Sequence, residues 1–226
     1  MSGRFITFEG GEGAGKSTQI DRLARRLEAQ GVSVVTTREP GGSERAERIR
    51  STLLGGGAKA LGRLAEALLF SAARLDHLES KIRPALDTGA FVLSDRFADS
   101  TRAYQGLDGG LEPAVIAGLE RIVVGATRPD LTVILDLPPE VGLARAAARR
   151  EARAEAADRF EAERIDFHER LRQAFLDIAR REPERCVVID ATQDVEQVED
   201  RIWAAVETRF AADLPAMEAP RKAHAG

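Results

Sequence analysis

The chain has 226 residues, of which 43% are hydrophobic and 31% charged, and its formal net charge at pH 7 is −4. This length suits one domain with a good-sized core and an inserted lid. The acidic balance argues against a sequence-independent nucleic-acid binder, which usually carries a basic stripe. A single cysteine, Cys186, excludes an intramolecular disulfide.

Nothing in the sequence suggests export or membrane insertion. No apolar run approaches the roughly 20 residues that a membrane span needs. The first residues, MSGRFITFEG, enter a strand-like run directly and leave no room for a signal peptide. We therefore expect a cytoplasmic protein without membrane or nucleic-acid partners.

Apolar runs rich in β-branched residues predict strands over residues 4–9, 32–38, 91–95, 131–137 and 186–190. The runs are continuous rather than alternating, as in strands that are buried on both faces. Helical patterns separate them and cover residues 17–30, 65–86, 111–124, 139–153, 165–181 and 195–210. This alternation predicts an α/β fold with about five parallel strands and right-handed crossovers. We expect one domain over residues 1–210 and a flexible tail, rich in Ala and Pro, over 211–226.

The segment GGEGAGKS at residues 10–17 lies between the first strand and the first helix and fits the pattern G-x-x-x-x-G-K-[ST]. Its glycines let backbone N–H groups approach phosphate oxygens, and the helix that follows adds its positive end. Lys16 can reach the β and γ phosphates, and the Ser17 hydroxyl suits Mg²⁺. The residues predicted to bind the triphosphate are Gly10, Gly11, Glu12, Gly13, Ala14, Gly15, Lys16, Ser17 and Thr18.

Several protein classes carry such a loop. A flexible turn would explain the glycines but not the strand, loop and helix in register. A dinucleotide fingerprint is excluded because Lys16 stands where that pattern needs Gly or Ala. The chain contains no asparagine, so it lacks the Asn-Lys-x-Asp motif that guanine-specific GTPases usually use. A motor ATPase fits poorly because no second nucleic-acid module is visible, which leaves a small-molecule kinase.

Three further motifs follow in order: TREPGGS at 37–43, LLFSAARLDHL at 68–78 and LSDRFADSTRAYQG at 93–106. Together with the glycine loop they resemble thymidylate kinase, the P-loop family that phosphorylates dTMP. The resemblance spans residues 5–202. It implies the P-loop NTPase fold with a short helical lid, transfer of the γ-phosphoryl group of ATP to dTMP to give dTDP, Mg²⁺ with the ATP, and a homodimer.

The resemblance also assigns the acceptor side. Phe70 would stack on thymine, Arg74 would donate to a base carbonyl, and Arg96 would bind the acceptor phosphate. Asp95, with Ser17, would hold Mg²⁺, and the ring of Tyr104 would leave no room for a 2′-hydroxyl. The residues expected to bind dTMP are Glu12, Arg38, Pro40, Arg50, Phe70, Arg74, Arg96, Ser100, Thr101, Tyr104 and Gln105.

The same residues also have purely structural interpretations. Taken alone, Phe70 would usually be a core side chain and Arg74 a residue with a solvated side chain. Tyr104 could be a half-buried core tyrosine. Asp95 and Arg96 could be an ion pair at a strand end. The family tends to have a cis bond before the proline that corresponds to Pro40, which the sequence alone cannot establish.

The lid is expected over residues 144–164, which carry six arginines and five acids. As a bare pattern, a mixed-charge helix is usually a solvated face. Some members of the family place an arginine inside the P-loop, and others supply it from the lid. Because the loop position is Gly13 here, the resemblance implies lid-borne arginines. The predicted catalytic residues are therefore Lys16, Asp95, Arg96, Arg149, Arg150 and Arg153.

Fewer sequence features indicate the adenine end of the site. The segment DATQ at 190–193 follows the last strand, where the family closes a loop around adenine. This resemblance assigns Thr192 and Gln193 to ATP, with Arg145 stacking on the other face of the ring. Asp136 could be structural. The histidines His77, His168 and His224 show no metal-ligand spacing and receive no role.

Two other classes stay open beside the kinase. A regulatory nucleotide-binding switch would keep the loop but lack an acceptor pocket. A nucleic-acid-dependent ATPase would show a basic surface and stimulation by DNA. Among kinases, one for another nucleoside monophosphate is the nearest alternative.

Overall fold

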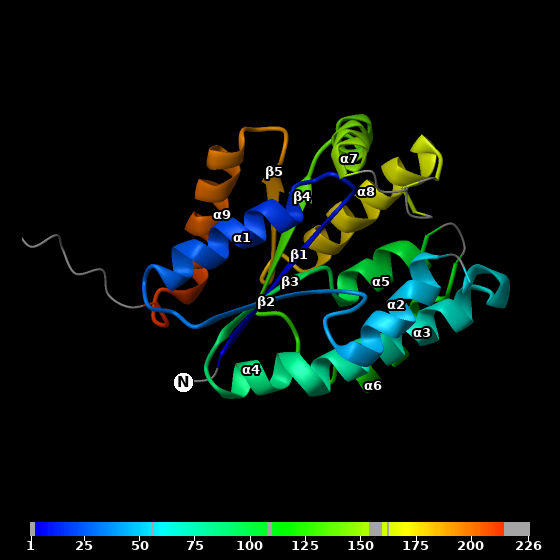
Figure 1. Ribbon diagram of the computed structural model, residues 1–226, viewed down its shortest axis with the longest axis horizontal. Coiled ribbons are helices and arrows are strands. Elements are labelled where there is room, and N and C mark those ends of the chain that lie inside the picture. Colours follow the sequence, from blue (N-terminus) through cyan, green and yellow to red (C-terminus); the bar gives the residue numbers. More distant parts are fainter. Residues whose placement is uncertain (1–2, 56, 108–109, 154–159, 162, 215–226) are drawn as a thin grey trace, which may run out of the picture.

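The computed structural model describes residues 3–55, 57–107, 110–153, 160–161 and 163–214 (Figure 1). In these residues one sheet has five strands in the order β2-β3-β1-β4-β5, and every neighbouring pair is parallel. The predicted α/β class is confirmed. The strands are β1 (Arg4–Gly10), β2 (Val34–Arg38), β3 (Phe91–Asp95), β4 (Leu131–Asp136) and β5 (Cys186–Asp190).

Helices cover both faces of this sheet, as Figure 1 shows. The long ones are α1 (Lys16–Glu28), α2 (Glu44–Leu54), α3 (Arg63–His77), α6 (Pro113–Val123), α7 (Pro139–Arg153), α8 (Ile165–Arg181) and α9 (Val195–Phe210). The short ones are a 3₁₀ turn η1 (Lys59–Leu61), a π turn η2 (Leu78–Ile82), α4 (Arg83–Asp87) and α5 (Ala98–Gln105).

The continuous apolar strands are explained by apolar clusters that pack against both faces of the sheet. Successive strand side chains point to opposite faces, so Ile6 and Leu93 pack in the core beneath α1 and α9. Their neighbours Phe5 and Val92 pack in the core with η2 and α6. All four side chains are buried. Both faces are therefore apolar, and alternation is absent from the sequence.

Two differences from the predicted helices have physical reasons. The helix predicted over 65–86 ends at His77 and continues as η2 and α4. Pro84 lies in the first turn of α4 and lacks a backbone N–H, so the regular hydrogen-bond ladder does not run through this turn. Helices α2 and α5 were not predicted. Helix α2, ERAERIRSTLL, is rich in helix-forming residues and was overlooked, whereas α5, ADSTRAYQ, has only eight residues and few strong helix formers.

The carboxyl ends of all strands lie at one edge of the sheet. Strand β1 lies between β3 and β4, so the chain leaves neighbouring strands toward different sides and a crevice opens beyond β1. Ligands of parallel α/β sheets bind at such a point. Every motif singled out from the sequence follows one of these strand ends or lies on a helix beside this crevice.

The remaining segments frame this edge. Helix α7 contains the first part of the predicted lid, and residues 154–159 and 162 lie outside the described residues. Asp213, in the first part of the predicted tail, pairs with Arg4 at 2.7 Å, and residues 215–226 lie outside the described residues. Within the described chain, no helix combines the length and the apolar character needed to span a bilayer.

Candidate functional site

The glycine loop joins β1 to α1 and needs glycine for two reasons. Gly10, Gly13 and Gly15 have φ angles of 133°, 64° and 89°, a region that L side chains rarely adopt. A Cβ placed on Gly13 would also lie 1.9 Å from the carbonyl oxygen of Gly142 in α7. The loop therefore passes directly against the helix that begins the lid, and an arginine at position 13 would not fit this arrangement.

Lys16, the first residue of α1, turns its ammonium group back over the loop. Its Nζ donates to the carbonyl oxygen of Gly11 at 2.9 Å and approaches that of Gly10 at 3.3 Å. Burial, and then the positive charge of Arg96, lower the pKa of Lys16. A poorly hydrated cation thus lies at the point that the sequence predicts for the transferring phosphates.

Ser17, in the first turn of α1, meets Asp95, the last residue of β3. The Ser17 Oγ donates to Asp95 Oδ2 at 2.7 Å, so Asp95 is not the partner of Arg96 that a simple strand-end ion pair would require. Two neighbouring oxygen groups suit Mg²⁺, which binds through one or two protein oxygens and otherwise keeps phosphate oxygens and waters. The described residues contain no cluster of three or more His, Cys, Asp or Glu side chains that could hold a metal ion.

A cleft of about 470 Å³ opens beside the loop. It brings together residues of the glycine loop, β2–α2, α2, α3, β3–α5 and α5, together with Arg149 of α7 and two lid residues, Phe160 and Glu161. Each residue that the resemblance assigns to dTMP lines this cleft, namely Glu12, Arg38, Pro40, Arg50, Phe70, Arg74, Arg96, Ser100, Thr101, Tyr104 and Gln105. Segments that lie far apart in the sequence therefore form one wall.

Arg96, Glu12 and Tyr104 form the centre of the cleft. The Arg96 guanidinium donates to Glu12 Oε1 at 2.7 Å, and the Tyr104 hydroxyl donates to the same oxygen at 3.0 Å. Arg96 has a φ of 68°, and its guanidinium carbon lies 5.2 Å from the centre of the Tyr104 ring. Burial acts to raise the pKa of Glu12, but Arg96, Lys16 and the Tyr104 hydrogen bond outweigh it and bring the pKa to about 2. Glu12 is therefore ionised at every pH at which an enzyme normally works.

Arg74 is held by a buried hydrogen-bond relay. Its Nε donates to Glu39 Oε2 at 2.7 Å, and its Nη2 donates to Thr101 Oγ1 at 3.0 Å. The other oxygen of Glu39 lies 3.2 Å from His77 Nδ1, and His77 Nε2 lies 2.7 Å from Thr37 Oγ1. Arg74, Glu39 and His77 are all buried. The relay fixes the direction of the Arg74 side chain, and it gives Glu39 and His77 a structural task that the sequence did not reveal.

The bend after β2 supplies the remaining wall. The peptide bond between Glu39 and Pro40 is cis, as the resemblance implied. Arg50 of α2 donates to the Pro40 carbonyl oxygen at 2.6 Å. Arg38 lies further out and pairs with Glu47 at 3.1 Å, with about half of its side chain exposed.

The lid arginines differ in their surroundings. Arg149 and Arg150 both form ion pairs with Glu161, that of Arg149 at 3.4 Å, but Arg149 lines the cleft and Arg150 does not. Phe160 meets the Tyr104 ring edge-on, with ring centres 4.9 Å apart. The side chain of Arg153 and all of Arg159 lie outside the described residues.

The residues predicted for the adenine end meet one another away from the cleft wall. Arg145 donates to the Ala191 carbonyl oxygen at 3.0 Å. Asp190 accepts from the Thr192 hydroxyl at 2.6 Å and lies 3.3 Å from the amide nitrogen of Gln193. Arg145 therefore lies beside the loop that follows β5.

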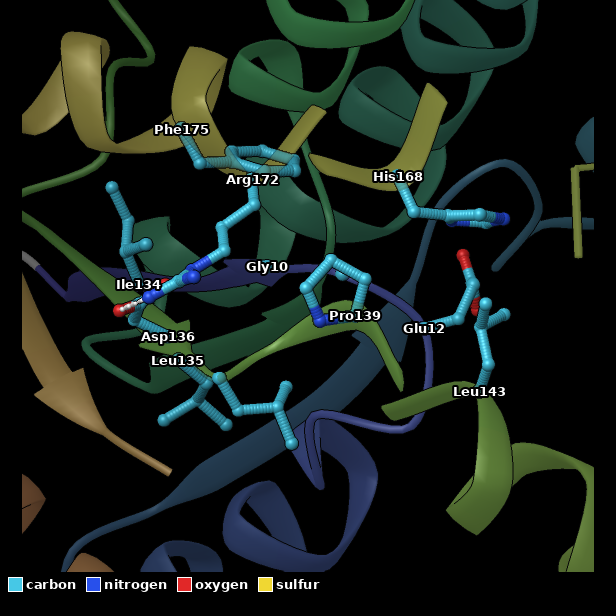
Figure 2. Close-up of a pocket in the computed structure, with 12 residues that line it drawn as sticks. Gly10, Glu12, Ile134, Leu135, Asp136, Pro139, Leu143, His168, Arg172 and Phe175 are labelled. Atoms are coloured by element: carbon cyan, nitrogen blue, oxygen red, sulfur yellow. Dashed lines mark hydrogen bonds and ion pairs between the residues drawn. The ribbon is translucent and has the colours of Figure 1, made fainter. Parts of the chain in front are cut away.

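A smaller cavity, of about 20 Å³, lies under the glycine loop between β4, α7 and α8 (Figure 2). Asp136 accepts from Arg172 at 2.7 and 3.0 Å, which gives it the structural role left open by the sequence. His168 is buried, and Figure 2 shows its ring close to the carboxylate of Glu12. Within the described residues its Nε2 has no hydrogen-bond partner. The third histidine, His224, lies outside the described residues.

Comparisons with known proteins agree with this site. A family model described as thymidylate kinase matches residues 8–202. Thymidylate kinase of Nitrobacter hamburgensis is 57% identical over 209 residues, which cover 92% of this chain and 90% of that protein. Thymidylate kinase of Rhodopseudomonas palustris is 59% identical over 211 residues, which cover 93% of this chain and 91% of that protein.

A solved structure gives the same result. The crystal structure of thymidylate kinase from Ehrlichia chaffeensis superposes with a TM-score of 0.71 at 35% identity, over 92% of this chain and 99% of that one. The expected P-loop NTPase fold is thereby confirmed. Since the family match runs from the glycine loop to α9 and the relatives match over nearly their full length, this chain belongs to the thymidylate kinase family.

Proposed function

We propose that the cleft is the place where this family member transfers the γ-phosphoryl group of ATP to dTMP, producing ADP and dTDP. The observation that carries the proposal is the continuity of the cleft, in which Lys16 and Ser17 line the same space as Phe70, Arg74 and Arg96. A nucleotide switch needs the glycine loop but has no use for the second half of this wall.

The donor side of the cleft would act through charge and position. Phosphoryl transfer depends mainly on aligning the two substrates and stabilising the charge on the transferring oxygens. Lys16 lies over the loop with its ammonium group already directed by backbone carbonyls. Arg96 comes from the acceptor side and is anchored to Glu12. The two cations thus approach the reacting group from opposite substrates.

The acceptor side would recognise dTMP by shape and hydrogen bonds. Phe70 offers a ring face for stacking on thymine, and base–aromatic stacking is worth roughly 1–3 kcal/mol. Arg74 would present its unused donors to a base carbonyl, since its other nitrogens are occupied by Glu39 and Thr101. Tyr104 would lie beneath the sugar, held by Glu12.

Mg²⁺ bound with ATP would be held by Ser17 and Asp95, whose oxygens already lie 2.7 Å apart. When bound there, the ion would neutralise part of the charge on the β and γ phosphates. Ser17 lies in the first turn of α1 and Asp95 is the last residue of β3, so this pair would also fix the glycine loop relative to β3. Arg145, Thr192 and Gln193 would hold the adenine beyond the loop.

Among the lid arginines we assign the phosphate contact to Arg149. Both Arg149 and Arg150 form an ion pair with Glu161, but Arg149 has the longer contact, at 3.4 Å, and it lines the cleft, whereas Arg150 does not. The glycine loop cannot provide this charge, since Gly13 packs against Gly142 without space for a side chain. Lid closure would also exclude water from the transferring group.

We further propose that the chain forms a homodimer through α3. Leu64, Leu68 and Leu75 lie on one face of this helix, by their spacing of four and seven residues, and each is about half exposed. Ile122 of the adjacent α6 is 76% exposed. A second copy would cover this stripe. Light scattering of the eluting protein should give the mass of a dimer, and Leu68→Arg should give a monomer. A monomeric parent would contradict the assignment.

The test of the activity is a coupled assay of ADP formation across a panel of nucleoside monophosphates, with ATP and Mg²⁺. We expect dTMP to give the highest kcat/KM. Preference for another monophosphate would replace the substrate, and ATP hydrolysis without any acceptor dependence would remove the kinase.

The use of ATP and the single cysteine, Cys186, also favour a cytoplasmic location, which fractionation of cells with an antibody to the chain would test.

A further inference from the structure

Glu9 is a buried acid that none of the roles above employs. It is the penultimate residue of β1, directly before the glycine loop, and its exposed fraction is 0%. Its carboxylate accepts three hydrogen bonds from another part of the chain. They come from the backbone N–H of Phe97 at 2.8 Å, the backbone N–H of Ser100 at 3.2 Å and the Ser100 hydroxyl at 2.7 Å.

These bonds start helix α5. The first N–H groups of a helix have no partner within the helix and need an acceptor from elsewhere. The residue at the helix start is Phe97, whose side chain cannot accept, and no side chain from α5 itself caps the helix. Glu9 fulfils this task from a different strand, and its negative charge also suits the positive end of the helix.

The same carboxylate determines how Ser100 faces Arg96. Because the Ser100 hydroxyl gives its hydrogen to Glu9 Oε2, its lone pairs are left for the Arg96 guanidinium, whose Nη1 lies 3.2 Å away. Arg96 has a positive φ of 68°, a conformation that is unfavourable for a residue with a side chain and persists where its surroundings hold it. Glu9 thus holds the turn that follows this strained residue in two ways. It accepts from the backbone N–H groups of Phe97 and Ser100 and from the Ser100 hydroxyl.

Burying a carboxylate here has an energetic cost. Burial, and then the nearby charge of Asp99, raise the pKa of Glu9 to about 7, while Arg96 and the Ser100 hydrogen bond lower it. The charged and titratable groups that face Glu9 are Asp99 and Tyr104 of α5, Arg96 before it and Lys16 of α1. An uncharged acceptor would suffice to cap the helix, so the cost points to a task beyond the cap.

We propose that Glu9 is a positioning residue for the acceptor substrate, which acts through Ser100 on Arg96 and fastens the acceptor-binding turn to the strand that carries the glycine loop. The inference rests on the proposed function, in which Arg96 binds the 5′-phosphate of dTMP. Glu9 itself lies below the cleft wall and is not among the residues that line it.

The test uses Glu9→Gln in the full chain, with KM for dTMP and KM for ATP measured separately. Glutamine keeps the size of the side chain and one oxygen for the two N–H groups, so α5 should still form. Its amide nitrogen, however, donates toward Ser100 and competes with Arg96 for the same hydroxyl oxygen. We expect KM for dTMP to rise about tenfold, the equivalent of one charge-assisted hydrogen bond, while KM for ATP stays within about twofold.

Ser100→Ala and the double variant test the route of the effect. If Glu9 acts through Ser100, the double variant should raise KM for dTMP no further than the larger of the single changes, because both remove the same connection. Independent effects that multiply would overturn the inference. So would a Glu9→Gln variant with parental KM for dTMP.

Asp99→Asn is the matched control. Asp99 is the neighbour of Ser100 and is also buried, but it pairs with Arg185 at 2.7 and 2.8 Å, and neither of these residues lines the cleft. We expect this variant to lower Tm while changing KM for dTMP less than Glu9→Gln does. If both variants raise KM equally, Glu9 merely stabilises α5 and the positioning role is wrong.

Arg96→Lys separates this inference from the proposed function. A lysine cannot reproduce the planar fork that meets Glu12, Ser100 and a phosphate together. If Arg96→Lys leaves KM for dTMP unchanged, the proposed role of Arg96 fails, whatever Glu9 does. If it raises KM for dTMP while Glu9→Gln does not, Arg96 keeps its role and the inference about Glu9 is overturned.

Discussion

The donor half and the acceptor half of the cleft are built in different ways. The centre of the donor half is one short segment, residues 10–18, which is defined by its backbone conformation and by its close approach to α7. The acceptor half collects side chains from residues 38 to 105, and these are held by buried hydrogen bonds between distant segments. A site made of backbone can be recognised in consecutive letters, whereas a site made of braced side chains depends on contacts that no short motif records.

The halves meet at Glu12, which belongs to the glycine loop but binds Arg96 and Tyr104 of the acceptor half. Below the cleft wall, Glu9 of β1 also binds Ser100 of the acceptor half. If this division is real, a change in either half should affect the kinetic constant of its own substrate. A change at Glu12 should affect both substrates, whereas a change at Glu9, which acts through Ser100, should affect dTMP alone.

The largest effect is expected for Lys16→Ala in the donor half. Removing a charge directed at the transferring group should lower kcat by about 10²–10³, the scale of a single deleted donor in other sites. KM for dTMP should stay within about twofold, because the hydrogen bonds that Lys16 donates in the described part of the chain go to the loop carbonyls of Gly10 and Gly11. Steady-state kinetics on a variant with parental Tm measures both. A rise in KM for dTMP as large as the fall in kcat would show that the halves are not separable.

Arg149→Ala should follow, with a loss of about a hundredfold in kcat and little change in either KM, as expected for a contact made mainly in the transition state. Arg150→Ala is its control on the same helix, because Arg150 pairs with Glu161 and does not line the cleft. It should retain most of the parental kcat. The reverse order of the two variants would transfer the catalytic role to Arg150.

Phe70→Ala should affect the acceptor half alone. Loss of stacking on the base predicts a ten- to hundredfold rise in KM for dTMP, from roughly 1–3 kcal/mol per stacked base. KM for ATP, measured in the same variant, is the internal control and should not change. If dTMP binds this variant as it binds the parent, the base lies elsewhere and the division of the cleft must be redrawn.

The last prediction concerns Glu9 and appears in stability rather than in turnover. The pKa of Glu9 is raised from 4.5 to about 7 by burial, so its contribution to stability is complete below pH 4.5 and is lost as the pH rises through 7. Glu9→Gln does not titrate. The free energy of unfolding of the variant should therefore gain on that of the parent between pH 5 and 8, by up to about 3 kcal/mol.

Urea unfolding of both proteins across that pH range measures this difference. Other titrating groups are common to the two proteins and cancel in the comparison. A difference that does not change with pH would mean that Glu9 has an ordinary pKa, and that its burial is less costly than the structure indicates.

The sequence predicted the donor half and the sheet well because both depend on local order. Continuous apolar runs located all five strands, and α8 and α9 begin and end where the 3.6-residue pattern placed them. The positions of positive φ in the loop could be predicted because glycine is the residue that adopts this conformation readily. In each case the determinant lies within a few residues of its effect.

The acceptor half needed the resemblance to a family, and some of it was missed. Helix α5 has only eight residues, ADSTRAYQ, and its start is fixed by Glu9, which lies 88 residues before Phe97 in the sequence. His77 and Glu39 hold Arg74 from separate elements and had no signature of their own. An acid within an otherwise apolar strand was the one signal that could have drawn attention to Glu9.

The central claim is that one cleft holds the phosphates of ATP on the glycine loop and dTMP on the braced side chains opposite. A crystal structure with dTMP, a non-hydrolysable ATP analogue and Mg²⁺ tests it most directly. The account predicts the thymine ring against Phe70, the 5′-phosphate at Arg96 and the terminal phosphate of the analogue between Lys16 and Arg149. A dTMP molecule bound outside this cleft, or bound with its phosphate away from Arg96, would contradict it.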